Sequence, residues 1–168
     1  MGFAGPASRP AALEGFRRVW DVAMDNTVDL PGYKHYVSPE TAGRPEVFVT
    51  FLNLAPEPGG CVNGVLLPVS DDDLVALDAR ERNYDRVDVT ERVAGDVEGT
   101  VWTYVGSAAG RRRYETGRRE GRAVVCRAYR DAALDAFAAL GDQALADFRG
   151  STAQPGCPVV DLRRVDTG

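Results

Sequence analysis

The sequence contains no isoleucine, a single lysine (Lys34) and a single histidine (His35) among its 168 residues. Its three cysteines, Cys61, Cys126 and Cys157, are far apart and odd in number, and no CxxC pair occurs. These shortages argue against a disulfide framework, a structural zinc site and any catalytic relay that needs a second histidine. They predict a protein of the reducing cytoplasm that binds no metal.

Long apolar runs are also missing. No stretch approaches the roughly 20 apolar residues that a membrane-spanning helix needs, and the first ten residues lack the pattern of a secretory signal. The net charge of −5, from 25 acidic and 20 basic residues, disfavours nucleic acid as a partner. With 44% hydrophobic residues, the chain is expected to fold as one domain over residues 1–168.

Strand-like patterns dominate the sequence. They cover residues 16–22, 47–54, 62–69, 84–93, 97–105 and 123–129. Pro45 and Pro56 bound the second of these stretches, which suits a separate strand buried on both faces. Many strands with few helices, in mixed order, predict an α+β domain with a curled or barrel-like sheet. The tail, residues 150–168, is expected to pack as an edge strand or to lie loosely on the surface.

Three helices are expected. Ser70 precedes Asp71–Asp73, which is the pattern of a hydroxyl N-cap with acids against the positive end of the helix dipole. Asp131 is expected to cap a second helix, which Gly141 ends. A third, short helix is expected over residues 143–148.

The most informative stretch runs over residues 62–89, where a strand, a capped helix and another strand follow each other. Glu81 lies at the end of this helix, between Arg80 and Arg82. The negative end of the helix dipole and burial both disfavour a charged carboxylate there, whereas the two arginines favour it. A carboxylate in such a balance is a usable general base. The alternative is a surface ion pair between Glu81 and an arginine.

The same stretch resembles the central motif of the gamma-glutamylcyclotransferase-like superfamily: from Gly64 it reads G-V-L-L-P-V-x-D-x-x-L-x-x-L-D-x-x-E-x-x-Y-x-R-V-x-V. The resemblance implies a small mixed β-barrel flanked by a few helices. It also implies an intramolecular reaction without metal or cofactor. The free α-amine of a γ-glutamyl group attacks its own γ-carbonyl, which releases 5-oxoproline and an amine or amino acid. Glu81 would be the general acid/base, with Tyr84 near the substrate.

Weaker parts of the resemblance extend to both sides of this motif. Leu13 to Arg18 (L-E-G-F-R-R) resembles the family's second strand, and Asn63-Gly64 resembles the entry to the third. On this basis Arg18, Asn63 and Gly64 are expected to line the substrate site beside Tyr84. The implied partner is a small γ-glutamyl compound.

The sequence departs from the family at its start. Members normally begin with a strand that ends in Y-G-S-[LN], whose backbone N–H groups hold the glutamyl group, and no such motif precedes Leu13. Residues 2–8 could be a remnant of the segment after that loop, while Tyr104–Ser107 echoes its letters at a position expected to be a strand end. A missing first strand would leave an exposed sheet edge open to self-association. The alternative function is then an inactive remnant, or a small-ligand or anion-binding protein of the same fold.

A dense arginine cluster occupies Arg111–Arg122, with Glu115 and Glu120 among the arginines. It could bind an anion or RNA, or supply an arginine to a substrate carboxylate. The acidic whole favours a solvated hairpin or loop that binds no nucleic acid, so that neutralising residues 111–113 would leave the fold unchanged. His35, after the Pro31-Gly32 turn, is expected to be a structural loop residue.

Overall fold

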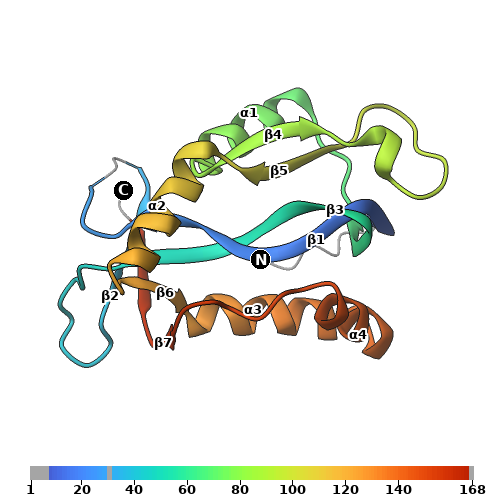
Figure 1. Cartoon of the computed structure of the whole chain (residues 1–168). Coiled ribbons are helices and arrows are strands. Elements are labelled where there is room, and N and C mark those ends of the chain that lie inside the picture. Colours follow the sequence, from blue (N-terminus) through green and yellow to red (C-terminus); the bar gives the residue numbers. More distant parts are fainter. Residues whose placement is uncertain (1–7, 30–31, 167–168) are drawn as a thin grey trace.

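A computed structural model describes residues 8–29 and 32–166, and within them the chain forms an α+β fold. Two long strands, β1 and β3, cross the middle of the molecule (Figure 1). The layer of α1, β4 and β5 lies on one side of them, and α3 and α4 lie on the other. Residues 2–7 and Pro31, which the sequence singled out, are outside the described residues.

The elements in chain order are β1 (Arg9–Asp25), β2 (Lys34–Val37), β3 (Phe48–Leu66), α1 (Asp71–Arg80), β4 (Tyr84–Asp88), a 3₁₀ turn (Thr90–Arg92), β5 (Trp102–Gly106), α2 (Ala108–Arg119), β6 (Ala123–Cys126), α3 (Arg127–Ala138), α4 (Asp142–Gly150), β7 (Val159–Val160) and β8 (Arg163–Asp166). The main sheet has the order β1-β3-β6-β7, and the pairs β2-β8 and β4-β5 form two small sheets. The described strands therefore form three separate sheets that do not close into a barrel.

Strands β1 and β3 pair in antiparallel register from Arg9 opposite Leu66 to Asp25 opposite Phe48. The expected strands 47–54 and 62–69 are thus parts of one strand, which continues through Pro56. Beyond Thr50 the ladder of β3 is to β1 alone. A proline is tolerated in a strand with one free edge, because its missing N–H then need not break a ladder.

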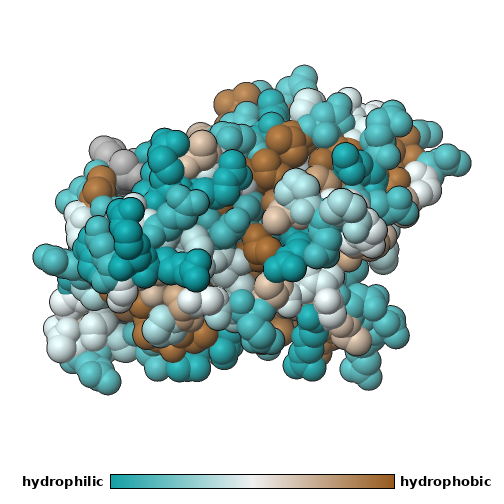
Figure 2. Space-filling view, viewed as in Figure 1, coloured by the Kyte–Doolittle hydropathy of each residue, from teal (hydrophilic) through white to brown (hydrophobic). Residues whose placement is uncertain are grey.

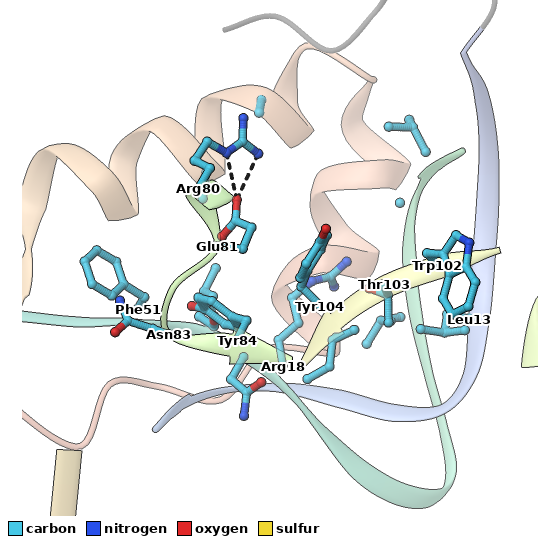
Figure 3. Close-up of a pocket in the computed structure, with 18 of the residues that line it drawn as sticks. Leu13, Arg18, Phe51, Arg80, Glu81, Asn83, Tyr84, Trp102, Thr103 and Tyr104 are labelled. Carbon is cyan, nitrogen blue, oxygen red and sulfur yellow. Dashed lines mark hydrogen bonds and ion pairs between the residues drawn. The ribbon is translucent and has the colours of Figure 1, made fainter. Parts of the chain in front are cut away.

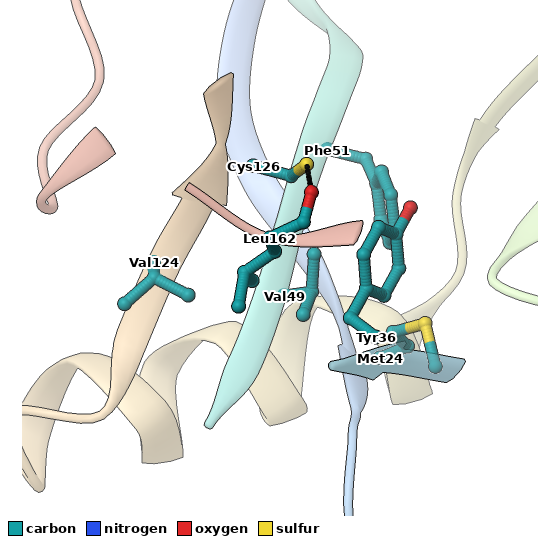
Figure 4. Packing of buried hydrophobic residues seen from close by; sticks show 7 residues of the cluster. All are labelled: Met24, Tyr36, Val49, Phe51, Val124, Cys126 and Leu162. Atoms are coloured by element: carbon teal, nitrogen blue, oxygen red, sulfur yellow. Dashed lines mark hydrogen bonds between the residues drawn. The ribbon is translucent and has the colours of Figure 1, made fainter. Parts of the chain in front are cut away.

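The largest group of buried apolar residues lies where β1, β2, β3 and β6 meet near the C-terminal strands (Figure 4). Its members are Met24, Tyr36, Val49, Phe51, Val124, Cys126 and Leu162. The Cys126 thiol donates to the carbonyl oxygen of Leu162 over 3.3 Å. A smaller cluster of Phe16, Val62 and Val89 closes the other end of the β1–β3 pair. Each fully buried side chain of this kind stabilises the fold by about 1.5–3 kcal/mol.

Residues 111–119 of the arginine cluster lie in helix α2 instead of the expected hairpin or loop. Ser107 caps the helix by accepting from the Gly110 N–H at 3.0 Å. Gly110 and Gly117, two turns apart, are buried, and a Cβ on Gly117 would lie 2.7 Å from Phe48. The face that packs on the sheet is therefore made of glycines. The sequence did not predict this helix, because a face made of glycines shows no apolar stripe at helical spacing.

The C-terminal helices also differ from expectation. Helix α3 begins at Arg127, directly after β6, so Asp131 lies inside the helix, where it pairs with Arg130 at 2.7 Å. Gly141, with φ of 113°, precedes α4 as its N-cap, and α3 ends before it. The tail contributes β7 to the main sheet and β8 as the partner of β2, so His35 lies in a strand, not in a loop.

Helix α1 has no buried residue, and Val75 on it is 69% exposed. Val75, Leu67, Val69 and Trp102 are exposed apolar side chains on or near the layer of α1, β4 and β5, and Figure 2 shows apolar surface there. No helix in the described part of the chain has the length and apolar character to cross a membrane.

Candidate active site

A cavity of about 1150 Å³ is lined by residues of β1 and β3, of α1, β4 and β5 on one side, and of α3 and α4 on the other (Figure 3). All five residues that the sequence singled out for the site line it. They are Arg18, Asn63, Gly64, Glu81 and Tyr84. They come from β1, β3, the end of α1 and the start of β4, so the fold brings together positions up to 66 residues apart.

Glu81 is the C-cap residue of α1, and its N–H donates to the Leu77 carbonyl oxygen at 2.9 Å. A capping box between Ser70 and Asp73 fixes the start of the same helix. The Glu81 side chain is 26% exposed, and its Oε1 pairs with Arg80 at 2.9 Å (Figure 3). Oε2 has no hydrogen bond to a described residue. Glu81 therefore pairs with an arginine, as the alternative interpretation expected, and it also opens onto the cavity.

Tyr84 contributes its ring to the cavity wall, while its hydroxyl donates to the carbonyl oxygen of Leu52 at 2.6 Å. Burial is the main cause that raises the pKa of Tyr84 well above the ordinary value of 10. Burial also raises the pKa of Tyr129 to about 12, against a backbone hydrogen bond from Leu52. The Tyr129 ring packs edge-on against Phe51, with centroids 5.2 Å apart. These two tyrosines therefore form a neutral, packed wall.

Arg18 is 8% exposed and has no carboxylate within ion-pair distance among the described residues. Its guanidinium donates to Ser151 Oγ at 2.8 Å, to Asn63 Oδ1 at 3.3 Å and to the Asn63 carbonyl oxygen. It also lies within 5 Å of the ring centroids of Phe137 and Phe148. Burial lowers the pKa of Arg18 to about 10. Arg18 thus joins β1 to β3 and to the end of α4.

Asn63 and Gly64 take different parts in the same wall. The Asn63 amide donates to the Ala144 carbonyl oxygen at 2.8 Å, which ties β3 to α4. A Cβ on Gly64 would meet no atom within 4 Å, so this glycine leaves open space at the cavity. In the described residues, no group of three His, Cys, Asp or Glu side chains could hold a metal ion.

The family model described as gamma-glutamyl cyclotransferase, AIG2-like, matches residues 6–121. This is more than half of the chain, and it contains every site residue that the sequence predicted. The chain belongs to this family. No curated protein matches it. For a member of the gamma-glutamyl cyclotransferase family, the part beyond residue 121 is informative, because α3, α4 and β8, which complete the cavity, lie outside the matched span.

Two further residues of this family member line the cavity although the sequence did not point to them. Asn83, 4% exposed, accepts from Arg113 at 2.7 Å and donates to the Tyr33 hydroxyl at 2.9 Å. Lys34 places its ammonium 4.6 Å from the ring centroid of Phe51. Lys34 stands out in the sequence as the only lysine. Because it is far from Glu81 in the sequence, nothing there indicated that the two residues line the same cavity.

Proposed function

We propose that the protein is a gamma-glutamylcyclotransferase, which converts an N-terminal γ-glutamyl group to 5-oxoproline and releases an amine or amino acid. The observation that carries the proposal is the position of Glu81. Its carboxyl group lies at the end of a capped helix, on the wall of the cavity and within the span that the family model matches. One of its oxygens is held by Arg80 and the other is open to a ligand.

The chemistry requires a group that moves protons between two nitrogens. The substrate α-ammonium loses a proton to the Glu81 carboxylate, and the resulting amine attacks the γ-carbonyl carbon. A new C–N bond closes the five-membered ring, and the bond to the leaving nitrogen breaks as Glu81 returns a proton to it. The ring nitrogen then gives up its second proton, which Glu81 passes to the released amine. In total two protons leave the nucleophile and two reach the released ammonium, so charge and atoms balance.

Proximity supplies the rest of the rate enhancement. The nucleophile and the electrophile belong to one molecule, so the site needs only to hold the γ-glutamyl chain folded back on itself. The rings of Tyr84 and Tyr129 give one packed wall for this, and the gap at Gly64 leaves room for the ligand. We propose Tyr84, Arg18, Asn63 and Gly64 as the residues around the bound substrate.

The test is to assay 5-oxoproline release from a panel of γ-glutamyl compounds with the wild-type chain and with Glu81→Gln. We expect the variant to lose about 10²–10⁴-fold in kcat/KM while its melting temperature is kept. Glu115→Gln, on the exposed side of α2, is the matched control and should keep full activity. A Glu81→Gln protein that keeps most of the rate would remove this residue from the mechanism.

The second candidate is a protein of the same fold that binds a small anion without turning it over. The buried Arg18 guanidinium, which lacks a carboxylate partner among the described residues, favours this candidate. The same panel separates the two functions: binding measured by calorimetry, with no 5-oxoproline formed by the wild-type chain, would favour the binding protein.

A further inference from the structure

The charge of the cavity is opposite to that of the chain. Although the chain has a net charge of −5, the cavity wall carries five cationic side chains: Arg18, Lys34, Arg80, Arg82 and Arg164. The described lining holds two carboxylates, Glu81 and Asp166. A concave site with one sign of charge raises the local concentration of ligands of the opposite sign.

The two carboxylates are already matched. Glu81 pairs with Arg80 at 2.9 Å, and Asp166 pairs with Arg164, its neighbour two residues earlier, at 2.5 Å. Arg18, Lys34 and Arg82 are left without a carboxylate in ion-pair distance among the described side chains. The cavity therefore has three cations beyond those that the protein itself neutralises.

Of these three, Lys34 is the one whose charged group makes no hydrogen bond to a described residue. Arg18 is bound to neutral oxygens of Asn63 and Ser151, and Arg82 donates to the Ala79 carbonyl oxygen at 3.3 Å. The Lys34 ammonium makes no hydrogen bond to a described residue. It lies over two aromatic rings, 4.6 Å from the centroid of Phe51 and 5.4 Å from that of Tyr33. A half-buried ammonium with unused donors is costly unless a ligand accepts from it.

Lys34 also lies within electrostatic range of the candidate acid/base. Burial is the main cause that lowers the pKa of Lys34, and the nearby Arg164 guanidinium acts in the same direction. The carboxylates of Glu81 and Asp166 oppose this lowering. The geometry agrees, because Lys34 and Glu81 line the same cavity, and the Tyr33 ring centroid lies 5.4 Å from the Lys34 ammonium and 5.5 Å from the guanidinium of Arg82, the residue after Glu81.

We propose that the leaving group of the substrate carries a carboxylate, which Lys34 binds, so that the substrates are γ-glutamyl amino acids or peptides and not γ-glutamyl amines. This inference rests on the proposed function. The γ-glutamyl part of every substrate has an α-ammonium and an α-carboxylate, which cancel each other in charge. Only an anionic leaving group offsets the surplus of cations. In an α-amino acid its carboxylate is bonded to the carbon next to the leaving nitrogen, and so lies near Glu81.

A matched pair of substrates isolates this carboxylate. γ-Glutamylalanine and γ-glutamylethylamide differ only in the carboxylate of the leaving group. We expect the wild-type chain to prefer γ-glutamylalanine by at least about tenfold in kcat/KM, as for one hydrogen bond between charged groups. Lys34→Met should bring the ratio of the two kcat/KM values to within about twofold of one, and Lys34→Arg should restore part of it. Arg119→Gln, which removes a cation from the exposed side of α2, should keep the wild-type ratio.

A binding experiment tests the role of Lys34 without relying on catalysis. In the Glu81→Gln background, calorimetry should show the same preference for γ-glutamylalanine, and adding Lys34→Met should remove it. Equal binding of the two ligands, or a preference that survives Lys34→Met, would overturn the inference. Equal release of 5-oxoproline from both compounds overturns it while leaving the proposed function in place. A binding preference without any release of 5-oxoproline overturns the proposed function instead.

Discussion

The hydroxyl of Tyr84 donates a hydrogen bond to the carbonyl oxygen of Leu52 at 2.6 Å, which connects the first residue of β4 to the free side of β3. Because Tyr84 is three residues after Glu81, this bond helps to fix where the end of α1 meets the cavity. The motif that names Tyr84 as a site residue therefore also contains a contact that holds the site in shape.

Tyr84→Phe should keep the ring and leave the Leu52 carbonyl oxygen without its donor. We expect a loss of about 1–3 kcal/mol in the free energy of unfolding, measured in urea. Tyr104→Phe is the control, because the Tyr104 hydroxyl bonds to the exposed carboxylate of Asp78, which water can solvate in its place. Equal stability of wild type and Tyr84→Phe would contradict the role of this bond.

Alkaline pH should destabilise the fold through the same tyrosines. Burial raises the pKa of Tyr84 well above 10 and that of Tyr129 to about 12. The unfolded chain releases these protons near pH 10, whereas the folded chain holds them. The contribution of these two tyrosines to the free energy of unfolding should therefore be constant below pH 10, and the free energy should fall as the pH rises from 10 toward 12. The check is a series of urea titrations over this range, in which a Tyr84→Phe, Tyr129→Phe double variant should show a shallower fall.

Arg113 on α2 should be a stability residue despite its place in a run of arginines. Its Nε donates to the Ala23 carbonyl oxygen at 2.8 Å, and its Nη2 donates to Asn83 at 2.7 Å. Arg113→Met should cost about 2–3 kcal/mol, because both acceptors lose their donor. Arg112→Met, which removes an exposed side chain, should change stability by less than about 0.5 kcal/mol. Similar unfolding curves for the two variants would contradict this difference.

Two glycines in helices should respond in opposite ways to alanine. At Gly117 a Cβ would lie 2.7–2.8 Å from the Phe48 side chain, and we expect Gly117→Ala to cost about 1–3 kcal/mol by overpacking. At Gly150 a Cβ would meet nothing within 4 Å, so Gly150→Ala should be neutral or stabilise by up to about 1 kcal/mol. The measurement is the melting temperature of both variants against wild type. A higher melting temperature for Gly117→Ala would show that α2 does not need the close approach of Gly117 to Phe48.

The features that could be predicted from the sequence were those that local spacing encodes. Ser70 with its three aspartates marked the start of α1, and Glu81 followed at its end. The glycine face of α2 has no apolar periodicity, so its arginines suggested a loop. In the structure these arginines lie on a helix. Arg111 donates to the Gly106 carbonyl oxygen, and Arg113 donates to Ala23 and Asn83, so these two bind neighbouring segments of the fold.

Long-range relationships escaped prediction for a different reason. Lys34 and Glu81 line the same cavity although they are 47 residues apart, and no local pattern reveals the pairing of β2 with β8 that places Lys34 in a strand. Pro56 suggested a strand boundary, since a proline in a central strand would break a ladder. Whether a strand is central or has a free edge is a property of the whole sheet.

The two backbone hydrogen bonds of Arg18 determine when the edge of β1 at this residue gains its partner. The Arg18 N–H donates to the Ser151 carbonyl oxygen at 2.8 Å, and the Ala153 N–H donates to the Arg18 carbonyl oxygen at 2.9 Å. A chain leaves the ribosome from its N-terminus, so β1 waits through the synthesis of more than 130 residues for these partners. A nascent chain that stops at Gly150 therefore presents an open edge to other chains at the part of β1 around Arg18. Translation has to pass Ala153 before this edge of β1 is protected.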